Sequence, residues 1–262
     1  MPTRPIKIGV QLHPQRTTYE EYRRAWIQLD EMGVDSLWTW DHFFPIYPNG
    51  NGPHFEGWTL LAALGALSRN AEVGCLVTGI GYRNPALLSN MAKTVDHITD
   101  GRLILGVGAG WSAKDYREFG YEFGTPGSRL KLLERGLEIV KDRWAQDEPR
   151  PVRGTIPILL GGGGERVTLR IAALHADIWH GFGAPTQWHE KSQVLDEWCA
   201  KVGRDPAAIE RSCGLPVEHA GRVDDFVAAG ATHLIHGSAV PFDQRFLEDL
   251  LAWRDTQRTT RT

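Results

Sequence analysis

The beginning of the chain shows a strand pattern of apolar positions and then a helix pattern. Within residues 6–12 every second residue is apolar, which is the two-residue period of a β-strand. A helix is expected to begin at Thr18, because Glu21 three residues later completes a capping box, and to end at Gly33. One face of this helix carries the larger apolar side chains, which are Tyr19, Tyr22, Trp26 and Leu29.

The same two patterns alternate through the rest of the chain. Apolar and aromatic runs predict further strands at residues 34–40, 73–78, 103–107, 156–160, 176–180, 210–215 and 232–236. Capping residues and helical spacing predict helices at 57–68, after Asn84-Pro85, across 130–144, and at 165–175, 186–202, 223–229 and 243–254.

Strands that alternate with helices predict a parallel sheet, and 262 residues is close to the length of one closed barrel. We therefore expect an α/β fold, a single (β/α)₈ TIM barrel that spans residues 1–262 as one domain. Residues 112–127 fall outside the alternation, before the long helix at 130–144. We interpret this excursion as a candidate lid.

Composition and charge narrow the classes of function. The net charge is −3, no basic block occurs, and no uncharged apolar run reaches the ~18 residues that span a bilayer. We expect a cytoplasmic protein that binds neither nucleic acid nor a membrane. Cys75, Cys199 and Cys213 are odd in number and far apart, so they predict neither a disulfide framework nor a zinc site.

Two glycine-rich segments follow predicted strands. The first follows the 156–160 strand and consists of Gly161, Gly162, Gly163 and Gly164. Such a segment at the start of a helix exposes backbone N–H groups to an anion, although a flexible turn is the alternative interpretation. The second, Gly106-Val107-Gly108-Ala109-Gly110-Trp111, ends the 103–107 strand. Together they favour a barrel mouth that holds a phosphorylated cofactor.

The remaining strand ends limit the chemistry. A metal hydrolase would need an H-x-H after the first strand, where only His13 stands, and no H-E-x-x-H occurs, so we expect no catalytic metal. The chain also has no G-x-S-x-G elbow, no Walker lysine and no G-x-G-x-x-G. A rim of histidines, aromatic residues and glycines is typical of a site where a cofactor supplies the difficult chemistry.

One block of sequence resembles a known family. Residues 75–88 read Cys-Leu-Val-Thr-Gly-Ile-Gly-Tyr-Arg-Asn-Pro-Ala-Leu-Leu, and residues 100–111 read Asp-Gly-Arg-Leu-Ile-Leu-Gly-Val-Gly-Ala-Gly-Trp. With Trp40-Asp41-His42, this block is similar to the bacterial luciferase-like superfamily of (β/α)₈ oxidoreductases, and most similar to members that use the deazaflavin coenzyme F420. The resemblance runs from residue 6 to about residue 181.

The resemblance implies roles for single residues. His42 would act as acid or base at the reactive face of the deazaflavin. Because Asp41 lies beside it in the sequence, we expect Asp41 to hold one imidazole nitrogen. A non-proline cis peptide bond would fall between residues 76 and 79, against the ring. The implied cofactor-binding residues are Leu76, Val77, Thr78, Gly79, Gly108, Ala109, Gly110, Trp111, Gly161, Gly162, Gly163, Gly164, Trp179 and His180. The implied substrate contacts are His13, Trp40 and Trp111.

Two departures from the family pattern refine this expectation. Members that oxidise a sugar phosphate carry an acid where this chain has Trp111, so we do not expect that activity; Trp111 could instead form a wall for an apolar or planar substrate. The segment between the long helix and Ile156 is shorter than usual for the family. The sequence therefore does not decide whether a lid closes over the site.

We predict an oxidoreductase that transfers a hydride between F420 and a small organic substrate. The alternatives are an FMN-dependent two-component monooxygenase and a non-catalytic flavin-binding barrel. The expected partner is a small-molecule substrate. A homodimer is possible, but the sequence does not determine the oligomeric state.

Overall fold

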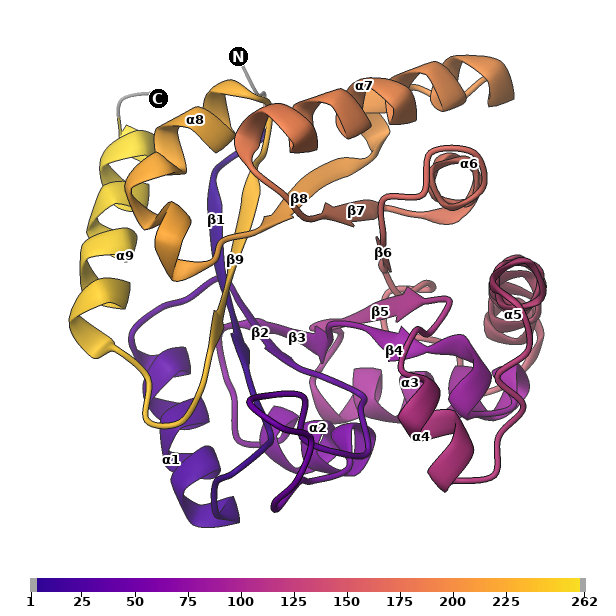
Figure 1. Cartoon of the computed structure of the whole chain (residues 1–262), viewed down its shortest axis with the longest axis horizontal. Coiled ribbons are helices and arrows are strands. Elements are labelled where there is room, and N and C mark those ends of the chain that lie inside the picture. The colour runs from indigo at the N-terminus through magenta and orange to yellow at the C-terminus, as the bar shows by residue number, and fades with distance from the viewer. Residues whose placement is uncertain (1–3, 260–262) are drawn as a thin grey trace.

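The strands close into a parallel barrel. The structure, a computed structural model, describes residues 4–259, and Figure 1 shows the strands surrounded by helices. The strands are β1 (Lys7–Leu12), β2 (Ser36–Thr39), β3 (Glu72–Cys75), β4 (Thr78–Gly79), β5 (Leu103–Gly108), β6 (Ile158–Gly161), β7 (Ile178–Gly181), β8 (Glu210–Gly214) and β9 (His233–Ser238). They pair in the order β3-β2-β1-β9-β8-β7-β6-β5-β4, and β3 also pairs with β5, which closes the ring. β3 and β4 are two parts of the third predicted strand, so the predicted (β/α)₈ barrel is confirmed.

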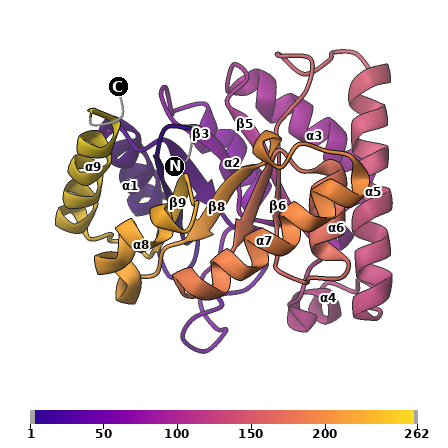
Figure 2. The same ribbon diagram turned by 90° about the horizontal axis from the view of Figure 1, so that it is seen from above.

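Helices cover the outside of this barrel. They are α1 (Tyr19–Glu31), α2 (Gly57–Gly65), α3 (Pro85–Ile98), α4 (Ala113–Glu118), α5 (Pro126–Gln146), α6 (Thr168–His175), α7 (Pro185–Val202), α8 (Val223–Ala228) and α9 (Gln244–Thr259). Short 3₁₀ helices occupy Ile80–Tyr82, Pro206–Ala208 and Val217–Arg222. Figure 2 shows α4, which lies in the predicted excursion, next to one end of α5. Within residues 4–259, no helix is both long enough and apolar enough to cross a membrane.

The first helix has the predicted cap. Thr18 Oγ1 accepts a hydrogen bond from the Glu21 N–H at 3.2 Å, and Glu21 Oε2 accepts one from the Thr18 N–H at 2.9 Å. The chain then leaves the helix through Gly33, whose φ of +82° is readily adopted by glycine. Of the four apolar residues on one face of this helix, three are buried, but Tyr19 is 42% exposed.

The third strand is interrupted at the barrel mouth. The peptide bond between Leu76 and Val77 is cis, within the interval that the resemblance implied. The Gln11 side-chain amide donates a hydrogen bond to the Leu76 carbonyl oxygen. Leu76 is buried in the barrel interior and Val77 packs against the same cluster. The backbone between β3 and β4 therefore places two apolar side chains at the mouth.

The helix after the glycine run at residues 161–164 begins later than predicted. We expected it to start at residue 165, but α6 starts at Thr168. Side chains of α7 bind the preceding loop, because Lys191 Nζ donates to the Gly163 carbonyl oxygen at 3.0 Å and Trp198 Nε1 donates to the Glu165 carbonyl oxygen at 2.7 Å. The Leu169 N–H donates to the Gly164 carbonyl oxygen at 3.0 Å, whereas a helix that began at residue 165 would direct it to the Glu165 carbonyl oxygen. The loop held by α7 therefore extends to residue 167.

One layer of large side chains fills the barrel interior. Its buried members are Trp38, Leu76, Ile104, Leu159, Ile178 and Ile235. Trp38 Nε1 in this layer donates to Ser36 Oγ at 2.7 Å, and this hydroxyl lies 2.7 Å from His233 Nε2. A larger apolar cluster fills the space between strands and helices.

Two buried histidines make stability depend on pH. Burial lowers the pKa of both His180 and His233 to about 3, whereas an unfolded histidine titrates near 6.5. Below pH 6.5 the unfolded chain therefore binds more protons than the native protein, so the free energy of unfolding falls as the pH falls. Each histidine contributes up to about 1.4 kcal/mol per pH unit.

Urea unfolding at pH 7 and at pH 5 tests this expectation. The double variant His180→Asn, His233→Gln should be less stable at pH 7 but should lose less stability between the two pH values than the parent. Asn and Gln keep the hydrogen-bonding nitrogen positions of these two rings without the titration. An equal loss in parent and variant would assign the pH dependence to other groups.

Candidate functional site

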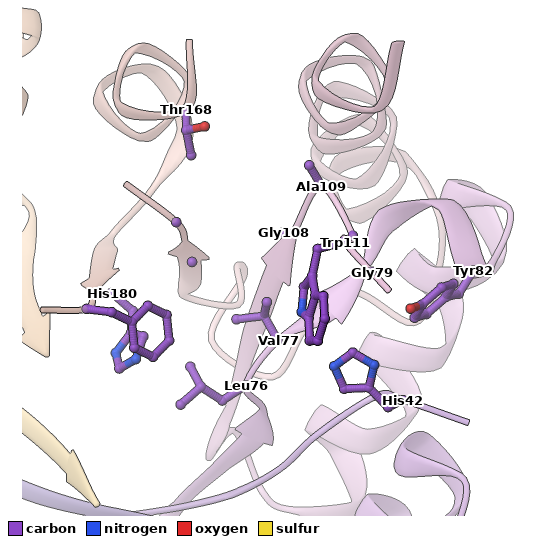
Figure 3. A pocket seen from close by; sticks show the side chains of 14 residues that line it. His42, Leu76, Val77, Gly79, Tyr82, Gly108, Ala109, Trp111, Thr168 and His180 are labelled. Carbon is purple, nitrogen blue, oxygen red and sulfur yellow. The ribbon is translucent and has the colours of Figure 1, made fainter. Parts of the chain in front are cut away.

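A cavity of about 310 Å³ opens at the carboxyl ends of the strands (Figure 3). The segments that follow β2, β4, β5, β6 and β7 enclose it, as expected for a TIM barrel. The predicted residues that line it are His42, Leu76, Val77, Gly79, Gly108, Ala109, Gly110, Trp111, Gly161, Gly162 and His180. Three further lining residues were not predicted, namely Tyr82, Thr168 and Phe182. The other predicted site residues lie outside this lining.

His42 is held by a carboxylate from a distant part of the chain. His42 Nδ1 lies 2.6 Å from Asp115 Oδ2, and the Tyr82 hydroxyl donates to the same oxygen at 2.9 Å. The other carboxylate oxygen of Asp115 accepts a hydrogen bond from the Phe43 N–H at 3.3 Å. Asp115 belongs to α4, so the predicted excursion supplies the partner of the predicted catalytic histidine.

The charge state of Asp115 determines which nitrogen of His42 carries the proton. Burial acts to raise the pKa of Asp115, but hydrogen bonds from His42 and Tyr82 lower it below its usual range. An ionised carboxylate only accepts hydrogen bonds. His42 therefore donates from Nδ1 to Asp115, and its Nε2 is left to interact with a ligand in the cavity.

The prediction that Asp41 holds His42 is wrong. Asp41 is 1% exposed, and its two carboxylate oxygens accept hydrogen bonds from Arg83 at 2.6 and 2.9 Å. Arg83 also pairs with Glu56. Neighbouring side chains at a strand end point to opposite sides, so Asp41 turns into the wall while His42 turns to the cavity. Asp41 supports the rim through Arg83.

Two predicted cofactor contacts lie behind the cavity wall. Thr78 is fully buried, and its Oγ1 accepts a hydrogen bond from Trp58 Nε1 at 2.9 Å. Trp179 is also fully buried, and its Nε1 donates to the Gly162 carbonyl oxygen at 2.8 Å. These side chains fix the shape of the wall and do not line the cavity.

The glycine run divides between two hollows. Gly161 and Gly162 line the main cavity, whereas Gly163 and Gly164 line an adjoining hollow of about 420 Å³; both hollows reach Thr168 at the start of α6. The N–H of Gly162 donates to the His180 carbonyl oxygen at 3.1 Å, so this group is already used within the protein. An anion would be bound further along, where the loop meets α6.

His180 lines the cavity and has one buried polar atom without a partner in the described part of the chain. Its Nδ1 lies 2.9 Å from Ser212 Oγ, and its Nε2 has no hydrogen-bond partner among the described residues. The side chain is 1% exposed, and burial keeps it uncharged. A buried polar atom without a partner costs free energy, so this nitrogen is suited to a hydrogen bond from or to a bound ligand.

The predicted substrate contacts His13 and Trp40 form a stack beside the cavity. Their ring centroids are 4.4 Å apart, and Trp40 lies edge-on to His42 at 5.9 Å. Burial and the neighbouring His236 lower the pKa of His13 to about 4, so it is neutral at pH 7. Neither His13 nor Trp40 lines the main cavity; Trp40 contacts His42, and His13 stacks on Trp40.

The cavity suits a planar ligand that is uncharged along its ring. Among the described lining residues none is Asp, Glu, Lys or Arg, and aliphatic and aromatic side chains dominate. Gly108 leaves room for the Val77 side chain in the wall, since a Cβ there would lie 3.0 Å from Val77 Cγ2. Apolar walls with a few polar groups are typical of cofactor sites. The partnerless His180 Nε2 and the oriented His42 fit an isoalloxazine-like ring with polar edges.

Comparison with known proteins gives a consistent assignment. The sequence matches the luciferase-like monooxygenase family over residues 4–256. A phthiodiolone/phenolphthiodiolone dimycocerosates ketoreductase from Mycobacterium sp. (strain JLS) is 30% identical over 234 residues, which are 76% of this chain and 58% of the relative. The structure of an F420-dependent secondary alcohol dehydrogenase with an F420-acetone adduct superposes with a TM-score of 0.82 at 16% identity, covering 95% of this chain and 97% of that one.

An FMN enzyme shares the same fold. The oxygenating constituent of 3,6-diketocamphane monooxygenase from Pseudomonas putida, solved with FMN, superposes with a TM-score of 0.64 at 19% identity, covering 80% of this chain and 67% of that one. The chain spans about half the length of the curated relatives that it matches, between 43% and 58%. The sequence match extends over nearly all of the chain, from the first strand to the last helix. The chain therefore belongs to the luciferase-like monooxygenase family.

Proposed function

We propose that this protein is an F420-dependent oxidoreductase that transfers a hydride between the deazaflavin and a small organic substrate. The observation that carries the proposal is the buried Asp115, which holds His42 with one nitrogen directed to ligands in an apolar cavity. An F420-dependent structure that shares the fold supports it.

When bound, the deazaflavin would supply or accept a hydride at its C5 atom. His42 would donate a proton to the substrate oxygen, or remove one, through Nε2. Asp115 would keep the ring oriented and stabilise the imidazolium that forms when His42 gains a proton. The apolar side chains of Leu76 and Val77 would exclude water from this place, so the proton would pass between His42 and the substrate.

Other residues of this chain would hold the cofactor. Leu76 and Val77 would contact one face of the ring, and His180 Nε2 would bind a polar ring edge. The start of α6 at Thr168, with Gly163 and Gly164, would bind the phosphate, because the first N–H groups of a helix attract anions.

Cofactor preference tests the proposal. We expect F420 to bind the purified protein at least tenfold more tightly than FMN, a difference of about 1.4 kcal/mol. Quenching of tryptophan emission during separate titrations measures both dissociation constants. Equal affinities, or tighter binding of FMN, would reject the deazaflavin assignment and favour the FMN-dependent monooxygenase.

The same titration with a glycine variant tests where the cofactor phosphate binds. Gly163 has no positive φ, and a Cβ there would meet only the flexible Lys191 side chain at 2.9 Å, so Gly163→Val should fold. Gly162 has a φ of +131° and is a poorer choice, since any side chain there strains the backbone. We expect Gly163→Val to weaken F420 binding, whereas the control Gly127→Val, at the start of α5, leaves it unchanged.

A further inference from the structure

Two large aromatic side chains stand exposed at the cavity mouth. Trp111 is 66% exposed and Phe182 is 63% exposed, although both line the cavity. Trp111 lies beside His42 with ring centroids 5.3 Å apart, and Phe182 packs against His180 at 4.8 Å. Figure 3 shows His180 across the cavity from Trp111, so the exposed rings approach the mouth from different sides. Exposed apolar surface around a cavity is typical of a ligand-binding site.

Among the described residues that line the cavity, none is a lysine or arginine that could pair with an anionic substrate. Two cations flank the segment after β5, but both bind backbone oxygens. Lys114 Nζ donates to the Gly50 carbonyl oxygen at 2.7 Å, and Arg129 Nε donates to the Gly110 carbonyl oxygen at 3.0 Å. A carboxylate or phosphate brought beside His42 would lose hydration without gaining a counterion, which is unfavourable.

Positive charge lies at the other end of the site. Arg166, Lys191 and one carboxylate, Glu165, line the hollow beside α6; Glu165 pairs with Lys191 at 3.4 Å, so the hollow keeps a net positive charge. Figure 3 shows Thr168, which also lines this hollow, far across the cavity from His42. The anion-binding end therefore belongs to the cofactor phosphate, and the end at His42 and Trp111 is left for the group that reacts. The two ends of the site differ in the charge that they accept.

We propose that the substrate is an uncharged alcohol or ketone with a planar, apolar body, which binds against Trp111 and Phe182 with its oxygen at His42. This inference rests on the proposed function and narrows it to a substrate class. It excludes phosphorylated and carboxylated substrates of similar size.

A matched pair of ketones tests the substrate class. Acetophenone and 4-acetylbenzoate share the carbonyl group and the ring and differ by one carboxylate. Each is titrated into protein saturated with oxidised F420, which cannot reduce them, and binding is followed by fluorescence. We expect acetophenone to bind at least tenfold more tightly than 4-acetylbenzoate. Equal affinities, tighter binding of the carboxylate, or no saturable binding of either ketone would overturn the inference.

Variants of the two rings test where the substrate binds. With the protein kept saturated with F420, Trp111→Ala and Phe182→Ala should each weaken acetophenone binding about fivefold, the scale of one lost aromatic contact. Trp111→Arg should reduce the difference in affinity between acetophenone and 4-acetylbenzoate, because it supplies a cation for the carboxylate. Phe119→Ala is the matched control, since Phe119 is 53% exposed but lies outside the main cavity.

Contact between copies of the chain is the competing explanation for the exposed rings. Sedimentation velocity on the same variants separates it from substrate binding. A lower oligomeric state with unchanged ketone affinity would overturn the inference. Failure of F420 to bind would overturn the proposed function itself, whereas tight F420 binding without discrimination between the ketones would overturn the substrate class alone.

Discussion

His42→Ala should bind F420 within about twofold of the parent and transfer hydride roughly 10²–10⁴-fold more slowly, the usual contribution of a positioned acid or base. The imidazole lines the cavity, and Asp115 fixes its orientation from behind. Removing the ring deletes the proton donor or acceptor without altering the walls formed by Leu76 and Val77. Single-turnover measurements on cofactor-saturated protein isolate this step from cofactor binding.

A matched histidine distinguishes catalysis from packing. His54 is also partly buried near the rim, where its Nε2 accepts a hydrogen bond from Trp40 Nε1 at 2.7 Å, but it does not line the main cavity. His54→Ala should lower stability and leave the single-turnover rate per folded molecule nearly unchanged. An undiminished rate in His42→Ala would place proton transfer elsewhere, with His180 as the next candidate because it lines the cavity.

The pattern of apolar positions was sufficient for the architecture. Alternation over residues 6–12 and the capping box at Thr18 are local signals, and the structure contains both elements there. The start of α6 was misplaced because Lys191 and Trp198 bind the loop from α7, a contact between segments far apart in the sequence. Local propensity cannot report such contacts.

The site residues that stand at the ends of strands were predictable from the sequence. His42, Gly108 and Gly161 follow strands, and the barrel brings them to one cavity. Asp115 was missed because it lies outside the strand–helix alternation, 73 residues from His42. The one available signal was the excursion at 112–127, which we interpreted as a lid; it supplies a buried hydrogen-bond partner to His42.

The predicted hydrogen bond between Asp41 and His42 failed for a physical reason. Sequence proximity suggested that it pairs with His42, but successive side chains in extended backbone point apart. Asp41 instead forms a buried pair with Arg83. Adjacency in sequence is therefore weaker evidence for a hydrogen bond at a strand end than the geometry of the sheet.

Asp115→Asn should retain F420 binding and slow hydride transfer by up to about 10⁴-fold, the effect seen when the carboxylate partner of a catalytic histidine becomes an amide. Asp115 accepts hydrogen bonds from His42 Nδ1, the Tyr82 hydroxyl and the Phe43 N–H. An amide offers one oxygen and one NH₂ group, so one carboxylate oxygen must be replaced by a donor.

The amide would orient to keep the Phe43 N–H paired, because a buried backbone donor without a partner is costly. Its NH₂ group would then face His42 Nδ1 and donate to it, which moves the imidazole proton to Nε2. Nitrogen-15 NMR of the histidine side chains reports this change of tautomer independently of the rate. Tyr82→Phe is the matched control, since it removes one donor but keeps the Asp115–His42 hydrogen bond, and it should slow transfer far less. A slow Asp115→Asn variant whose His42 keeps its proton on Nδ1 would show that the carboxylate acts through its charge, and a variant with the parent rate would remove Asp115 from the mechanism.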